Sequence, residues 1–248
     1  MRALLATFER ELRAYFFSPL AYVILTFFLF SNGRDFNLIV SYLSDPRVGG
    51  TSAPLFQLFL GGTILFWPLM WFVPPLLTMR LIAEERRSGT IETLMTAPIS
   101  ETQVVVGKYL AALVFFVFLW LPTVLYVVII GRSTEVDWGP IASGYLGIFL
   151  IGSLFLAVGV FCSSLTKNQI VAAVATVAIL LTLFAAAFLE QLASGELWQS
   201  IFSYLSLLDH MDELSRGIVD SRRLVFYLST TALFLFLASR ALAAKKWR

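Results

Sequence analysis

Long apolar runs constrain this chain more than any other feature of its sequence. A bilayer core about 30 Å thick is crossed by a helix of about 20 apolar residues. Six runs reach about that length, over residues 20–42, 56–79, 109–130, 140–163, 169–189 and 223–243. The chain is 58% hydrophobic and 14% charged, whereas soluble domains average about 45–50% and about 25%. We therefore predict an all-α membrane protein with six transmembrane helices in a single transmembrane domain, residues 1–248.

The basic residues predict the orientation of the chain. With six spans, both termini lie on the same side of the membrane. That side holds 12 of the 18 Lys and Arg residues, and basic residues are enriched in cytoplasmic loops. We therefore predict a multi-pass protein of the bacterial inner membrane with both termini in the cytoplasm.

Two further segments have helical periodicity but are too short or too polar to span. In residues 2–16 the apolar side chains share about a third of the helical circle, and Arg2, Glu9, Arg10 and Arg13 lie opposite. This pattern predicts an amphipathic helix in the membrane interface, within residues 1–18. Residues 190–222 repeat apolar side chains at helical spacing, which predicts one or two amphipathic helices on the outer face.

Small residues are concentrated in the fourth and fifth spans. Small side chains let helix backbones approach closely in lipid. Because residues 165–169 are a short link, the two spans are predicted to form an antiparallel pair packed within the chain. A subunit interface is the alternative.

No catalytic or metal-binding pattern is present in the sequence. The chain has one cysteine, Cys162, and one histidine, His210, so neither a disulfide nor a histidine–cysteine metal cluster is expected. His210 lies between Asp209 and Asp212 and is predicted to be solvated. The run VVVGKY, residues 104–109, lacks the first glycine and the final Ser or Thr of a phosphate-binding loop. We expect no catalytic residue, metal or cofactor, and the net charge of +2 suggests no nucleic-acid partner.

The polar strip EERRSGTIETLMTAPIS, residues 84–100, separates the second and third apolar runs. Ser88 or Thr90 can cap a short helix there, and Pro98 ends it because proline blocks helix continuation. The sequence from Ser100 to Gln103 fits a capping box, which would begin the third span. These signals predict a short helix set crosswise between two spans. A solvated loop that touches nothing is the alternative.

Residues 74–113, PPLLTMRLIAEERRSGTIETLMTAPISETQVVVGKYLAAL, resemble the type-two exporter permeases of ABC transporters. The matching positions are Glu84, Glu85, Gly89, Thr90, Glu92, Pro98, Ser100, Gly107 and Lys108. SSLTKNQIVAA, residues 163–173, and SLLDHMDELSRGIVDSRRLVFYL, residues 206–228, resemble the gliding-motility and copper-processing branch of that family.

The resemblance implies a permease subunit coupled to a separate ATPase. Residues 84–100 would be the cytoplasmic coupling helix that docks on an ABC ATPase subunit. ATP hydrolysis would then occur on that partner and drive export or mechanical transmission across the membrane. Since one copy carries one coupling segment, we expect a homodimer or a heterodimer with a related permease. The short outer loops leave any periplasmic domain to a partner. The rival class is an ATP-independent carrier or a membrane scaffold.

Residues 32–35 interrupt the first apolar run, where the resembled family has an uninterrupted span. A helix that starts at Leu20 places Arg34 about 21 Å along its axis, at 1.5 Å per residue. At that depth a long basic side chain can reach the interface by snorkelling. The alternative is functional: Asn32, Arg34 and Asp35 would line a polar outer vestibule.

Overall fold

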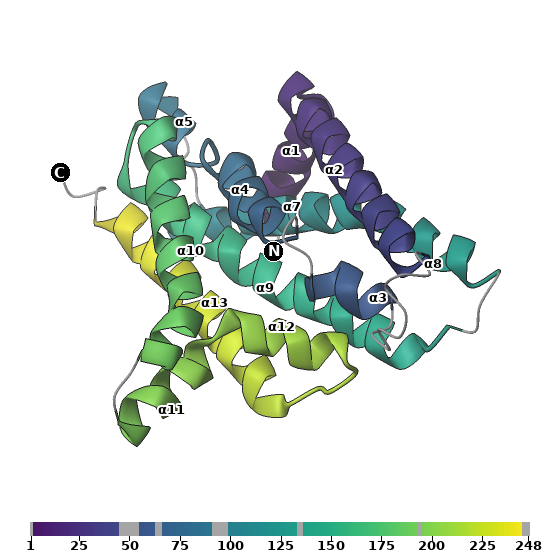
Figure 1. Cartoon of the computed structure of the whole chain (residues 1–248). Helices are drawn as coiled ribbons and strands as arrows, with labels where there is room; N and C mark the ends of the chain where they lie inside the picture. Colours follow the sequence, from purple (N-terminus) through teal and green to yellow (C-terminus); the bar gives the residue numbers. More distant parts are fainter. Residues whose placement is uncertain are drawn as a thin grey trace.

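Helices form all the regular secondary structure of the described chain. The computed structural model describes residues 2–44, 55–62, 66–90, 99–132, 136–192 and 195–244 (Figure 1). The elements are α1 Arg2–Phe16, α2 Pro19–Leu43, α3 Leu55–Gln57, the π-helix η2 Leu58–Gly62, α4 Phe66–Thr78, α5 Ala83–Arg87, α7 Glu101–Trp120, the 3₁₀ helix η3 Leu121–Thr123, α8 Val124–Ile130, α9 Trp138–Leu165, α10 Gln169–Leu192, α11 Glu196–Leu205, α12 Leu207–Ser215 and α13 Ser221–Ala243.

Six helical stretches are long and apolar enough to cross a membrane. They are Pro19–Leu43, Leu55–Arg87, Glu101–Ile130, Trp138–Leu165, Gln169–Leu189 and Ser221–Ala243, the second of which includes residues outside the described ranges. The predicted all-helical class with six spans is therefore confirmed. The second span is not one regular helix, because it combines α3, η2 and α4, and α4 contains Pro74 and Pro75.

Helix α9 is the centre of the fold, and it crosses the middle of the molecule in Figure 1. Its side chains are mostly buried, and it packs against α13, α10, α12, α4 and α7. A Cβ added at Gly152 would lie 2.2 Å from the ring of Phe116 on α7, and one at Gly159 would lie 2.0 Å from Thr78 on α4. The small residues of α9 thus serve packing within the chain, as predicted, but these glycines face α7 and α4 rather than α10.

The first span is continuous through the polar residues that interrupt its apolar run. Ser18 precedes α2, and Pro19 occupies its first turn, where a missing N–H costs nothing. The Asn32 side-chain amide donates to the Phe28 carbonyl at 2.9 Å, so this polar group is satisfied inside the helix. Residues 32–35 therefore place polar groups on both the buried and the exposed side of α2 without ending the helix.

The face opposite α1 and α5 is closed by α12, and this corrects one prediction. His210 is 0% exposed rather than solvated. Its Nδ1 lies 2.9 Å from the Tyr227 hydroxyl of α13, and the Ser143 hydroxyl of α9 donates to the Leu214 carbonyl of α12 at 2.6 Å. The prediction was wrong because the polar neighbours of His210 in sequence point elsewhere, while α12 turns His210 toward the bundle. Helix α11, in contrast, leaves its apolar Leu197 and Trp198 exposed.

Candidate functional site

The candidate site is built around α5, the short helix that follows α4. The chain turns between Met79 and Ile82, and Ser163 at the end of α9 holds this turn. The Ser163 hydroxyl accepts from the N–H groups of Ile82 and Ala83, both at 3.1 Å, and donates to the Met79 carbonyl at 3.1 Å. One hydroxyl thus uses its full capacity of one donor and two acceptors. The N–H groups at a helix start need such partners, so α9 fixes where α5 begins.

Two further side chains attach α5 to the link between α9 and α10. Arg86 donates from Nη1 to the carbonyls of Ser164 at 2.8 Å and Thr166 at 3.3 Å. These carbonyls lie at the C-terminal end of α9, where a cation is favourable. Glu84 accepts a hydrogen bond from the side-chain amide of Gln169, the first residue of α10. Helix α5 is therefore joined to the fourth and fifth spans as well as to the second.

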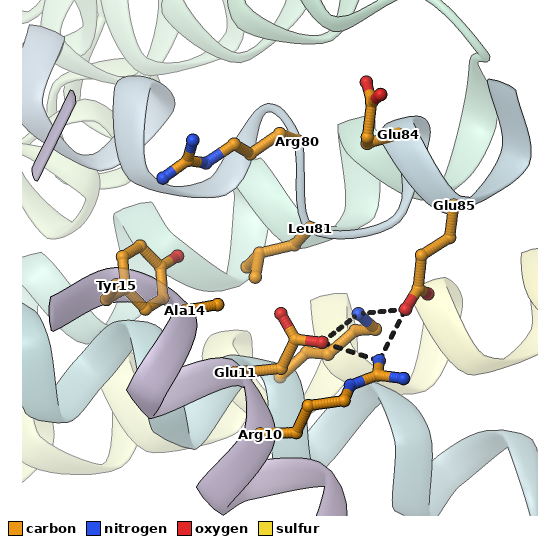
Figure 2. Close-up of a pocket in the computed structure, with 9 residues that line it drawn as sticks. Arg10, Glu11, Ala14, Tyr15, Arg80, Leu81, Glu84 and Glu85 are labelled. Carbon is orange, nitrogen blue, oxygen red and sulfur yellow. Dashed lines mark hydrogen bonds and ion pairs between the residues drawn. The ribbon is translucent and has the colours of Figure 1, made fainter. Parts of the chain in front are cut away.

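A cluster of four alternating charges joins α5 to α1 and α7, and Figure 2 shows Arg10, Glu11 and Glu85 of this cluster with its ion pairs as dashed lines. We call Arg10, Glu11, Glu85 and Lys108 the four-charge cluster. Lys108 Nζ lies 2.8 Å from Glu11 Oε1 and 2.9 Å from Glu85 Oε1. Arg10 Nη2 lies 2.7 Å and 2.6 Å from the same two oxygens. Two cations therefore bridge two carboxylates that come from different helices.

Burial makes this cluster different from an ordinary surface ion pair. The Lys108 side chain is 1% exposed, and those of Glu11 and Glu85 are 14% and 16% exposed. Burial alone would raise the pKa of Glu11, but the charges of Lys108 and Arg10 outweigh it and hold that pKa below its usual value. A buried charge without a partner is costly, so the three largely buried members, Glu11, Glu85 and Lys108, depend on one another.

Gly107 explains how α1 comes close enough to place Glu11 beside Lys108. A Cβ at Gly107 would lie 3.2 Å from the Leu4 carbonyl oxygen and 3.2 Å from Thr7 Cβ. The glycine thus permits close packing of α1 on α7. The adjacent residues Gly107 and Lys108 therefore have different roles. Gly107 lets α1 pack closely on α7, and Lys108 forms an ion pair with Glu11 of α1.

A cavity of about 380 Å³ adjoins the cluster. Figure 2 shows Arg80 and Glu84 across this cavity from the cluster, with Tyr15 at one side. The Tyr15 hydroxyl donates to the Leu77 carbonyl at 2.7 Å, and Arg80 donates to the Ser18 hydroxyl at 2.9 Å. Burial raises the pKa of Tyr15, so it stays a neutral donor. The cavity wall is therefore charged with both signs, between α1 and α5.

The predicted coupling residues fall into three groups. Glu84, Gly89 and Thr90 are exposed on or just after α5, whereas Glu85 turns inward to the cluster. Ser100 is the N-cap of α7: its hydroxyl accepts from the Gln103 N–H, and the Gln103 side chain accepts from the Ser100 N–H, so the predicted capping box is confirmed. Glu92 and Pro98, and with them most of the predicted short helix, lie outside the described residues.

The predicted vestibule residues are not brought together on one side of α2. Asn32 and Asp35 lie on the buried side of the helix, and Arg34 lies on the exposed side. All three lie in the second half of α2, away from α5. The start of α2, in contrast, lies near α5, because Arg80, which precedes α5, donates to the hydroxyl of Ser18, which precedes α2. They therefore form no part of the site around α5.

Sequence reasoning did not single out several members of the site. Glu11, Arg86 and Gln169 were given no role, and Ser163 appeared only as the first residue of the segment 163–173. The third apolar run begins at residue 109, just after Lys108, but α7 begins at Glu101, as the capping box predicted, so Lys108 lies about two turns inside the helix. The sequence did contain a sign of the cluster. A lysine two turns inside a span needs a buried anion as a partner, because an unpaired buried charge is costly. The sequence did not show which one.

These features define a polytopic helical membrane protein in which a short helix on one face is fastened to most of the spans. Residues 12–244 match the family described as ABC-2 family transporter protein. The chain belongs to this family, and it is a multi-pass permease component of an ABC transporter. No curated protein sequence matches the chain significantly.

Proposed function

We propose that this permease docks a separate ABC ATPase on its cytoplasmic face through residues 84–100, and that ATP-driven movement of this segment serves export or mechanical transmission across the bacterial inner membrane. The single observation that carries the proposal is the attachment of α5. Side chains connect this short helix to α1, α7, α9 and α10, and the chain connects it to α4. A solvated loop would lack such attachments.

The attachments favour a wider mechanical role than the sequence alone suggested. The sequence placed the strip between the second and third spans only. Ser163 and Arg86 add the fourth span, and Gln169 adds the fifth. A force on α5 would therefore reach four spans. Packed helices transmit such displacements because protein interiors are dense and have few voids.

The exposed residues of the strip are the proposed contacts of the ATPase. Glu84 offers a carboxylate that an ATPase groove can meet with Arg or Lys, and Thr90 offers a hydroxyl. Gly89 has φ of 77°, a left-handed backbone angle that favours glycine, and no atom lies within 4 Å of its Cβ position. Its role is to direct the chain after α5. Glu92, Pro98 and Ser100 complete the proposed contact, while Glu85 supports it from inside.

The test is charge reversal at two exposed positions of the strip. Glu84→Arg combined with Glu92→Arg is expected to abolish copurification of the ATPase while leaving membrane insertion intact, because the strip lies outside the lipid. The matched control is Asp212→Arg, an exposed carboxylate on α12 at the opposite face. Full ATPase occupancy and full ATP hydrolysis by the doubly reversed complex would contradict the assignment of these two carboxylates.

A second variant tests the part of the strip that follows α5. Residues 89–98 are replaced by a Gly/Ser linker of equal length, which spares the internal contacts of Glu84, Glu85 and Arg86. Normal coupled activity of that variant would contradict the coupling role. A chain that copurifies with no ATPase at all would instead favour the ATP-independent carrier or scaffold.

The remaining parts of the proposal concern assembly. Two ATPase sites require two coupling segments, so a second copy of this chain or a related permease completes the transporter. A periplasmic domain, where the system has one, belongs to a partner. The segments 163–173 and 206–228 support a place in the gliding-motility and copper-processing branch.

A further inference from the structure

We propose that Lys108 is a positioning residue that fastens the interfacial helix α1 to the ATPase-docking helix α5, so that α1 and α5 move together. This inference rests on the proposed function of residues 84–100. It adds a route by which movement of α5 reaches the first span, α2.

The route follows from the position of the four-charge cluster. Glu11 lies on α1, Glu85 on α5 and Lys108 on α7, and both carboxylates converge on one ammonium group at 2.8 Å and 2.9 Å. Helix α2 begins at Pro19, only three residues after α1 ends at Phe16. A displacement of α5 passed to α1 by the cluster therefore reaches the start of α2.

Lys108 and Arg10 contact the same two oxygens but are not equivalent. The Arg10 side chain is 53% exposed, so water and salt screen its interactions and its loss should matter little. Lys108 is almost fully buried. Without Lys108, two neighbouring carboxylates would keep only the exposed Arg10 as a partner, and like charges in a shared buried site repel each other. The structure thus predicts that Lys108 holds α1 and α5 together and that Arg10 is dispensable.

The contacts of Glu85 indicate that the cluster, rather than solvent, holds the side of α5 on which Glu85 lies. Both cation contacts of Glu85 use Oε1, and its Oε2 is buried without a hydrogen-bond partner among the described residues. The carboxylate is therefore oriented by Lys108 and Arg10 alone among the contacts described. The neighbours of Glu85 contact other helices: Glu84 contacts α10, and Arg86 contacts the end of α9. Helix α5 is therefore held by α1 and α7 through Glu85, and by α9 and α10 through Glu84 and Arg86.

The experiment measures the distance between α1 and α5 by pulsed electron paramagnetic resonance. Nitroxide labels are attached to cysteines introduced at Arg13 and Ser88, both exposed. The only native cysteine, Cys162, is buried and is replaced by serine. Spectra are recorded for the membrane-inserted chain alone, and for its complex with the ATPase in ATP-bound and ADP-bound states.

The wild-type chain is expected to give one narrow distance distribution in every state. Lys108→Met is expected to broaden that distribution and to make it dependent on nucleotide, while ATPase occupancy stays unchanged and the permease-stimulated rate of ATP hydrolysis falls several-fold. Lys108→Arg keeps a cation at this position and should restore much of both properties. Arg10→Gln is the matched control and should leave the distribution narrow.

A separate variant tests the inference even if Lys108→Met does not fold. Glu85→Gln removes the charge on α5 while Lys108 keeps Glu11 as a partner, so no lysine is left unpaired. It should broaden the α1–α5 distance in the chain alone. An unchanged distribution in Glu85→Gln, or in folded Lys108→Met, would overturn the inference. Failure of the proposed function is distinguishable, because the distance in the chain alone is measured without any ATPase.

Discussion

At the residue scale, α2 shows how two neighbouring polar residues in one span can have different roles. Arg34 lies on the exposed side of the helix, where its long side chain can reach the interface, and Asp35 lies buried on the opposite side. The structure therefore favours snorkelling for Arg34. The vestibule proposal now depends chiefly on Asn32 and Asp35, which face the bundle.

We predict opposite outcomes for substitutions at these two positions. Arg34→Leu should change the free energy of unfolding by less than about 0.5 kcal/mol, as is usual for exposed positions. Asp35→Asn should destabilise the protein by about 1–3 kcal/mol, because it alters a buried hydrogen-bonding group. Thermal unfolding in detergent measures both. Normal assembly of Arg34→Leu with lost ATPase stimulation would instead assign Arg34 to a vestibule.

At the scale of elements, α12 and α13 are joined by a histidine whose ionisation is suppressed. His210 contacts Tyr227, and Asp209, Glu213 and Arg223 carry the charges around it. Burial and the charge of Arg223 lower the pKa of His210 from 6.5 to about 4. The histidine is therefore neutral at pH 7, and the contact between α12 and α13 suits the neutral form.

Acidification should weaken this contact. Between pH 6.5 and about 4, a state in which α12 has left the bundle binds more protons than the folded state, so stability rises with pH in that window and falls on acidification. From pH 7 to pH 5 the loss should be about 2 kcal/mol, since one pKa unit corresponds to about 1.4 kcal/mol. The measurement is the thermal midpoint at both pH values.

His210→Gln provides the control for that measurement, because it keeps a hydrogen-bonding group beside Tyr227 but does not titrate. Its midpoint should depend less on pH between 7 and 5. The pKa of Glu11 is lowered from 4.5, so the stability that Glu11 contributes is lost only at more acidic pH. An equal pH dependence in wild type and His210→Gln would contradict the role of His210.

At the scale of the whole molecule, the arrangement of the spans predicts which surfaces face each side of the membrane. Helix α5 lies with the start of α10, and α12 lies with the start of α13 at the other face. We propose that the α5 face is cytoplasmic, because most basic residues lie on that side.

Cysteine labelling tests this orientation. Single cysteines in residues 131–139 should react with a membrane-impermeant maleimide added to intact cells, and those in residues 84–100 should react only after permeabilisation. Replacing Cys162 by serine removes the native thiol. The reverse pattern of labelling would overturn the proposed orientation and, with it, cytoplasmic docking of the ATPase.

Local properties of the sequence determined the helical architecture. The cost of placing a segment in lipid depends on its own composition, so the six spans were predictable from apolar length. The interfacial position of the first helix is also a local inference, from its amphipathic pattern, and the start of α7 was predictable because the capping box of Ser100 and Gln103 involves residues three positions apart.

Tertiary structure alone decided which side chains meet. Glu11 and Lys108 are 97 positions apart, and the Ser163 hydroxyl serves N–H groups about 80 positions earlier. Such pairings depend on how helices cross, which no local pattern specifies. The same reason explains His210, whose polar sequence neighbours predicted exposure while the packing of α12 on the bundle, mainly on α9, buried it. The sequence by itself therefore determined how many helices cross the membrane, whereas their packing decided that α5 is fastened to α1, α7, α9 and α10.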